Sequence, residues 1–151
     1  MAEAQIPLAL ASDHAGFRYK KAIKEHLQNR GYVVRDFGTD SEDAVDYPLF
    51  IRPAAEAVAK GECSCGIVLG GSGNGEAMAA NKVNGIRCAV VWSEETATWA
   101  KEHNKANMIS IGQRTVPLET ALALVDTWLT AQFQGGRHQR RIDQLEPESG
   151  G

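Results

Sequence analysis

Apolar residues along the chain alternate between short continuous runs and helically spaced segments. Five mainly apolar runs predict strands, at residues 6–11, 32–37, 66–69, 86–91 and 108–111. The segments between them have helical periodicity and predict helices over residues 16–29, 48–60, 75–82, 93–103 and 117–129. Strands that alternate with helices indicate an α/β protein with a mostly parallel sheet of about five strands.

Residues at the predicted boundaries support these assignments. Gly31 is placed to end the first helix, Ser93 to cap the fourth at its N-terminus, and Pro117 to open the fifth. A length of 151 residues corresponds to one domain, which we expect to span 1–151. The stretch from about residue 146 to 151 reads as a frayed tail.

Composition and charge narrow the function classes. A formal net charge of −3 disfavours a general nucleic-acid or membrane-surface role. No run approaches the ~18 apolar residues of a membrane span, and the first residues do not read as a secretory signal. Cys63, Cys65 and Cys88 are odd in number and make a poor zinc signature, so we expect reduced thiols in a cytoplasmic protein.

Polar residues follow several of the predicted strands. In a parallel α/β sheet, ligands bind at the carboxyl ends of the strands. The groups found there are Ser12-Asp13-His14, Gly70 to Glu76, Trp92-Ser93 and Gly112-Gln113-Arg114. His103 ends the fourth long helix and is expected near the opposite edge of the sheet. It is therefore either structural or part of a site on a neighbouring subunit.

The glycine-rich segment "GGSGNGE" (70–76) fails three common motifs. The dinucleotide fingerprint requires a third glycine where Glu76 stands, and it follows the first strand, not the third. A P-loop requires lysine at position 76, where a carboxylate would repel a triphosphate. A nucleophile elbow requires glycine in place of Asn74.

An alternative function fits a glycine loop that carries a glutamate. Exposed backbone N–H groups at a helix N-terminus stabilise anions. If Glu76 removes a proton from a carbon next to a carbonyl, these groups can hold the enediolate oxygen that forms. The structural alternative is that Glu76 only complements the helix dipole and the glycines only allow tight packing. The residues alone leave both interpretations open.

The other polar groups also have two interpretations. Asp13 and His14 either cap the first helix or serve the site, and His103 can be a plain helix-end residue. The only basic cluster comprises Arg137, His138, Arg140 and Arg141. On a helix, positions 137 and 141 share a face, as a phosphate clamp requires, although a solvated face is equally ordinary. The cluster is too short for nucleic acid and lacks interleaved aromatic residues.

Four motifs in register resemble the type B ribose-5-phosphate isomerases, in the family that also holds galactose- and allose-phosphate isomerases. They are SDHAG (12–16), GGSGNGE followed by AANK (70–82), HNKAN (103–107) and RHQRRID (137–143). The resemblance runs from about residue 8 to 145. It implies a Rossmann-like three-layer sandwich with a five-stranded sheet, and a homodimer, sometimes paired into tetramers, with sites at the interface. It implies no metal and no nucleotide cofactor.

The resemblance also implies a reaction. The family interconverts aldose and ketose phosphates through a cis-enediolate, and one branch uses a cysteine base at the position of Gly70. This chain resembles the actinobacterial-type branch, in which the residue matching Glu76 is the base. That branch implies ribose 5-phosphate and ribulose 5-phosphate, a pair of the pentose phosphate pathway, as substrates. A six-carbon sugar phosphate remains the alternative, and a non-catalytic sugar-phosphate sensor a more distant one.

Roles for individual residues follow from the same resemblance. His103, with Asn104 beside it, matches the residue that opens the furanose ring. The anion hole is matched by Ser72 and the backbone of Gly71, Gly73, Asn74 and Gly75. Asp13 and Tyr47 are expected to contact the sugar or shuttle protons. Phosphate ligands are expected at His14, Arg114, Arg137, His138 and Arg141, some of them from the other chain.

Overall fold

The central feature is a parallel β-sheet. The computed structural model describes residues 5–146, which form five strands in the order β2-β1-β3-β5-β4, with every neighbouring pair parallel. The strands are β1 (Leu8–Ser12), β2 (Val34–Asp36), β3 (Gly66–Gly70), β4 (Cys88–Val90) and β5 (Met108–Gly112). The predicted sheet is confirmed, although the run at 32–37 yields a shorter strand than expected.

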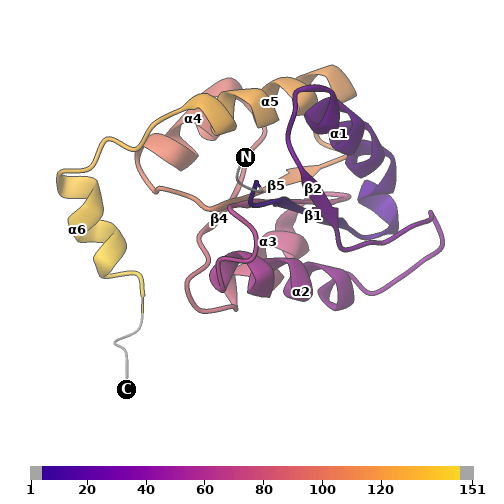
Figure 1. Ribbon diagram of the computed structural model, residues 1–151, viewed down its shortest axis with the longest axis horizontal. Coiled ribbons are helices and arrows are strands. Elements are labelled where there is room, and N and C mark those ends of the chain that lie inside the picture. Colours follow the sequence, from indigo (N-terminus) through magenta and orange to yellow (C-terminus); the bar gives the residue numbers. More distant parts are fainter. Residues whose placement is uncertain (1–4, 147–151) are drawn as a thin grey trace.

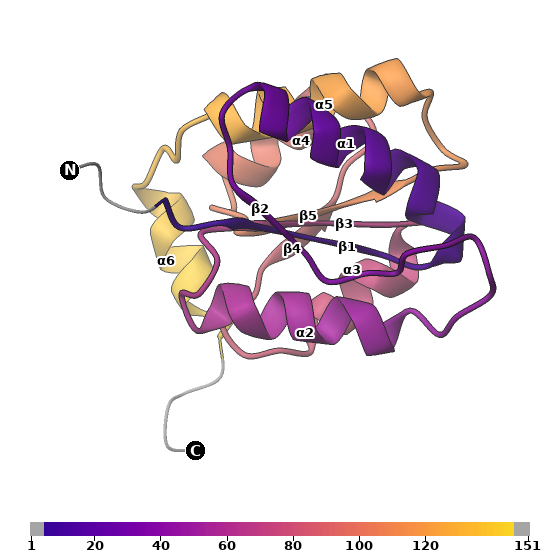
Figure 2. The ribbon, with the colours of Figure 1, turned by 45° about the vertical axis from the view of Figure 1, so that its right-hand side comes forward.

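Helices cover both faces of the sheet. They are α1 (Phe17–Asn29), α2 (Pro48–Ala59), α3 (Asn74–Asn81), α4 (Glu94–Glu102), α5 (Leu118–Thr130) and α6 (Arg137–Asp143), with a 3-10 turn, η1 (His14–Gly16), before α1. Figure 1 shows α1, α4 and α5 on one face and α2 and α3 on the other, and Figure 2 shows the same three layers from another side. The expected Rossmann-like sandwich is confirmed. No helix within residues 5–146 is long and apolar enough to cross a membrane.

The sheet separates two hydrophobic cores. Along β1, Leu8 and Leu10 pack under α1, α4 and α5, whereas Ala9 and Ala11 pack against α2 and α3. The strands β3 and β5 are buried along their whole length. Because successive side chains in a strand point to opposite faces, a strand buried on both faces is almost entirely apolar. This explains why the strands appear in the sequence as continuous runs.

One charged pair lies inside this framework. The Lys20 side chain on α1 is 2% exposed, and its Nζ lies 2.6 and 2.8 Å from the two carboxylate oxygens of Asp36 on β2. Burial by itself raises the pKa of Asp36, but bonds from Lys20 and from the N–H of Gly38 hold the pKa below its usual value. The pair ties the first helix to the edge of the sheet.

Helix ends follow the predicted signals, with one difference. Ser93 and Thr96 form a reciprocal capping box at the start of α4, and Gly31 adopts a positive φ of 89° just beyond α1. The first helical segment was expected from residue 16. Instead, Asp13 caps the turn η1, accepting a 3.0 Å hydrogen bond from the Gly16 N–H, and α1 starts at Phe17.

The C-terminal helix α6 stands away from the three layers (Figure 1). Glu146 lies at the start of the predicted tail. Glu146 Oε1 lies 3.4 Å from Arg87 Nη1 and is thereby linked to the start of β4. Residues 147–151 lie outside the described residues.

Candidate active site

The glycine loop joins β3 to α3 at the carboxyl edge of the sheet. Gly73 has a φ of +85° at the N-cap of α3, a conformation that favours glycine. Its carbonyl accepts a 2.7 Å hydrogen bond from the hydroxyl of Ser110 on β5. The Ser72 hydroxyl accepts a 3.2 Å bond from the N–H of Asn74. Among residues 5–146, no hydrogen-bond acceptor pairs with the N–H groups of Ser72 and Gly73, which leaves them free for an anion.

Glu76 lies in the first turn of α3 with its carboxyl group buried. The residue is 4% exposed, and its carboxyl occupies the space beside Gly70, where a Cβ on residue 70 would overlap it. Burial raises the pKa of Glu76, and the neighbouring carboxylate of Asp13 raises it further, against a lowering bond from its own backbone N–H. A raised pKa brings a carboxylate closer to the proton affinity that a general base requires.

Three further predicted residues gather at this edge. Asp13 is 8% exposed; it caps η1, and its carboxylate also neighbours that of Glu76. His14 Nδ1 accepts a 3.1 Å bond from the Val45 N–H, which fixes the tautomer with the ring proton on Nε2. The Tyr47 ring lies close against Gly75, where an added Cβ would be 2.7 Å from Cζ.

Arg114 follows β5 and is exposed beside the loop. A Cβ on Gly71 would lie 3.3 Å from Arg114 Nη1, so the guanidinium group rests against the glycine backbone. The Arg114 N–H donates a 2.9 Å bond to the Gly71 carbonyl. The carboxyl edge therefore combines a buried carboxylate, free backbone N–H groups, and one guanidinium group.

The second group of predicted residues lies at the opposite edge. The His103 ring stacks on Trp99, with ring centroids 6.2 Å apart, and on His138 of α6, with centroids 4.5 Å apart. Arg137 and Arg141 are exposed on α6, four residues apart on the same helix. His138 is 8% exposed, and its buried Nε2 has no hydrogen-bond partner within residues 5–146.

Burial and three neighbouring basic side chains determine the direction in which the pKa of His138 shifts. Burial lowers the pKa of His138, and the adjacent Arg137, His103 and Arg141 lower it further. The same basic surroundings favour an anion. Asn104 is exposed directly after His103, in the turn that follows α4.

The described chain does not bring these two groups together. Glu76 follows the carboxyl end of β3, whereas His103 precedes the amino end of β5. These strands are parallel neighbours of five residues each, and such a strand spans roughly 16 Å. One group, at the carboxyl edge, therefore comprises Asp13, His14, Tyr47, Glu76, the loop and Arg114. His103, Asn104 and α6 form another.

Sequence reasoning did not single out two supporting residues. Ser110 holds the glycine loop from inside β5, and its signal is a lone hydroxyl in the otherwise apolar run "MISIG". Trp99 stacks on His103 from the preceding helical turn, and its signal is the i,i+4 spacing. Neither signal identifies a supporting residue until the fold shows which residues these side chains contact.

The cysteines are free thiols outside this chemistry. Cys63 and Cys88 are buried among apolar residues. Burial and the nearby Glu76 raise the pKa of Cys88 to about 12, and burial raises the pKa values of Cys63 and Cys65. A thiol with a raised pKa is a poor nucleophile or base at neutral pH. Residues 5–146 hold no group of three or more His, Cys, Asp or Glu placed to bind a metal.

The fold is a parallel α/β sandwich with a buried carboxylate beside a glycine loop at the carboxyl edge of its sheet, and its sequence matches a known family of α/β enzymes. The family model described as Ribose/Galactose Isomerase matches residues 8–145. The chain belongs to this family.

Individual relatives agree with the family match. The chain is 52% identical over 138 residues to ribose-5-phosphate isomerase B of Mycolicibacterium paratuberculosis, covering 90% of this chain and 87% of the relative. It is 44% identical to the Escherichia coli protein of the same name, with coverage of 91% and 93%.

Solved structures show the same fold. Ribose-5-phosphate isomerase B of Clostridium thermocellum superposes with a TM-score of 0.91 at 49% identity, covering 92% of this chain and 94% of the other. The Mycoplasma genitalium enzyme, solved with bound ribulose 5-phosphate, gives a TM-score of 0.90 at 42% identity with 95% coverage of each chain.

Proposed function

We propose that this protein interconverts D-ribose 5-phosphate and D-ribulose 5-phosphate. The observation that carries the proposal is the buried Glu76 carboxyl, which has a raised pKa and lies beside the free N–H groups of the glycine loop. The names of the relatives, and the ketose bound in the Mycoplasma genitalium structure, support this substrate pair.

The reaction uses Glu76 as a single base. Its carboxylate takes the proton from C2 of the open aldose, and negative charge moves onto the C1 oxygen. The N–H groups of Ser72 and Gly73 hold the resulting enediolate. The carboxyl group then returns the proton to C1, while a proton passes from the C2 oxygen to the C1 oxygen. Asp13 and Tyr47 border the loop and supply polar groups for that second transfer.

The complete site takes its other half from a second copy of the chain. His103 lies too far from Glu76 to act on the same sugar within one chain, so we place it, with Asn104, in the site of a paired subunit. There its imidazole accepts the proton of the C1 hydroxyl while a solvent water gives a proton to the ring oxygen, so that the C1–O4 bond breaks and the furanose opens. A two-fold dimer produces two such sites, because each chain contributes one half to each.

The phosphate group lies between basic side chains from both copies. His14 and Arg114 approach it from the glycine-loop half. Arg137, His138 and Arg141 approach from α6 of the second copy, and the unpartnered Nε2 of His138 is available as a ligand. Guanidinium groups suit phosphate because they present paired donors.

The activity is tested in D₂O without added metal. Wild-type protein incubated with ribose 5-phosphate is expected to form ketose and to place deuterium at C2 of recovered aldose. The Glu76→Gln variant should lose both. D-allose 6-phosphate, measured in parallel, tests the six-carbon alternative, and faster turnover of allose 6-phosphate would overturn the pentose assignment.

Sharing of the site between chains is tested by complementation. As homodimers, Glu76→Gln is expected to be inactive and His103→Ala to turn over ribose 5-phosphate only slowly. Mixed in equal amounts and refolded, they form heterodimers with one intact site, which restores about one quarter of wild-type activity for random pairing of two-fold dimers. No recovery in a mixture shown to contain heterodimers would place both residues in one chain's site.

A further inference from the structure

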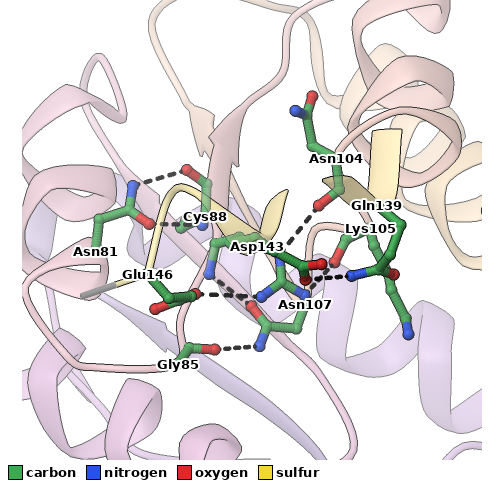
Figure 3. A network of polar contacts seen from close by, with 10 residues as sticks. Asn81, Gly85, Cys88, Asn104, Lys105, Asn107, Gln139, Asp143 and Glu146 are labelled. Atoms are coloured by element: carbon green, nitrogen blue, oxygen red, sulfur yellow. Dashed lines mark hydrogen bonds and ion pairs between the residues drawn. The ribbon is translucent and has the colours of Figure 1, made fainter. Parts of the chain in front are cut away.

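Arg87 lies immediately before β4, and its side chain donates hydrogen bonds to the turn that contains His103. Its Nε donates a 3.1 Å bond to the carbonyl of Asn104, and its Nη2 donates a 2.9 Å bond to the carbonyl of Lys105. Its Nη1 lies 3.4 Å from Glu146 Oε1. Figure 3 shows this network, with Asn104 and Lys105 on one side and Glu146 on another.

These bonds occur where the helix itself provides none. The carbonyls of Asn104 and Lys105 lie beyond the last helical residue, Glu102, so no N–H group of the helix reaches them. The turn is closed on the helix side by the N–H groups of Lys105 and Ala106, which donate to the carbonyls of Lys101 and Ala100 at 3.1 and 2.8 Å. After α4, Lys105 adopts a φ of 45°, a conformation that a side chain disfavours and that surrounding contacts must maintain. Two donors from one guanidinium group satisfy two successive carbonyls of this turn and so fix the direction in which the backbone leaves His103.

The backbone of Arg87 is itself fixed. Its N–H donates a 2.8 Å bond to Asn107 Oδ1, and Asn107 Nδ2 donates a 2.8 Å bond to the carbonyl of Gly85. The Arg87 side chain is therefore anchored to a fixed backbone beside β4, from which its guanidinium group bonds the turn. Through Glu146 it also reaches the segment after α6, the helix whose His138 stacks on His103.

We propose that Arg87 is a positioning residue for ring opening: it holds the turn after α4 so that His103 is presented in the orientation that the furanose requires. This inference rests on the proposed function, in which His103 opens the ring. Arg87 does not touch the substrate in this scheme. It acts through the backbone of Asn104 and Lys105.

Lysine cannot replace arginine in this role. A single ammonium group cannot reproduce the planar fork that bonds two adjacent carbonyls and a carboxylate at once. Arg87→Lys keeps the positive charge but leaves at least one carbonyl without its donor. The matched control is Arg35→Lys on β2, because the Arg35 side chain is 53% exposed and its nearest carboxylate, Glu62, is 3.9 Å away.

Two rates separate a ring-opening defect from general damage. The first is turnover of ribose 5-phosphate, which is mainly cyclic and needs ring opening. The second is uptake of solvent deuterium at C1 of ribulose 5-phosphate at saturating concentration. That exchange proceeds through the enediolate at Glu76 and involves no ring. His103→Ala gives the reference pattern of slow aldose turnover with retained ketose exchange.

Arg87→Lys is expected to lower aldose turnover at least about 10-fold, since small misplacements of a catalytic group have effects of that size, while changing ketose exchange less than 3-fold. Arg35→Lys should leave both rates unchanged. Glu146→Gln loosens the third contact and should give the same pattern, with a loss of about 3-fold.

Three results would overturn the inference. They are unchanged aldose turnover in folded Arg87→Lys, an equal fall in both rates, and a Glu146→Gln enzyme that matches wild type. The last applies even if Arg87→Lys does not fold. Failure of the proposed function is a separate result, because the wild-type protein would then show neither turnover nor exchange.

Discussion

Replacing Gly70 with alanine tests the geometry of the base directly. Position 70 ends β3, and a Cβ there would overlap the Glu76 carboxyl group from one side. Because β3 is buried and paired on both sides, the strand cannot move away. The carboxyl group must therefore move instead.

The size of the effect follows from the overlap. Ordinary van der Waals contact of carbon atoms needs about 3.5 Å, so the carboxyl group must move by roughly 1.5 Å. A misplacement of about 1 Å costs on the order of 10²-fold in rate, or about 2.7 kcal/mol in the activation barrier. We expect Gly70→Ala to lower kcat by about 10²- to 10³-fold, and to leave KM less affected, because the proposed phosphate ligands are other residues.

The assay is the initial rate of ketose formation from ribose 5-phosphate at saturating substrate, with circular dichroism to confirm folding. Gly31→Ala is the matched control, because a Cβ there meets nothing within 4 Å and its cost comes from a φ of +89° alone. It should lose stability, about 1 kcal/mol, but not activity. A folded Gly70→Ala enzyme within 3-fold of wild-type kcat would refute the assignment of Glu76 as the base.

Three further outcomes are expected. Asp13→Asn removes a carboxylate that raises the pKa of Glu76, so the acid limb of the kcat/KM profile should move to lower pH; an unmoved limb would contradict the coupling. Arg137→Ala should raise KM about 10-fold through loss of a charge-assisted phosphate bond, whereas its neighbour Arg140→Ala should not. Lys20→Met leaves the half-buried Asp36 carboxylate with only the more distant ammonium of Lys24, 3.3 Å from Oδ2, and the Gly38 N–H. It should lower the free energy of urea unfolding at neutral pH by about 1.5–3 kcal/mol, the usual contribution of a hydrogen bond to a charged group. Folding lowers the pKa of Asp36, so the stability that this ion pair contributes is lost as the pH falls through the folded-state pKa. The difference in unfolding free energy between wild type and Lys20→Met should therefore shrink at low pH.

The sequence was sufficient for the layers of this fold and for most of its strands. Buried strands and amphipathic helices have different periods, so the order of elements can be read locally. The glycine loop could also be judged from spacing alone, because Glu76 stands where the other glycine-loop motifs need lysine or glycine. That judgement needed only the types of residue at fixed positions within the loop.

The sequence could not decide between the two meanings of Asp13 or of His103. Asp13 proved to be both a cap and a neighbour of Glu76, a contact across more than sixty positions that no local pattern encodes. Arg87 shows the same limit. It looks like an ordinary strand-end cation until the fold brings it under the turn that follows His103.

What the sequence determined by itself was the set of chemical groups: a carboxylate beside free backbone N–H groups, an imidazole, and arginines spaced for phosphate. The order of the elements already predicted His103 at the edge opposite Glu76, and only the tertiary structure decided which groups are in contact there, such as His138 on His103. Parallel strands send all their carboxyl ends to one side, so the helix that returns the chain places His103 on the other. That separation, set by strand direction and strand length, is the physical reason why half of the proposed site is assigned to a second copy of the chain.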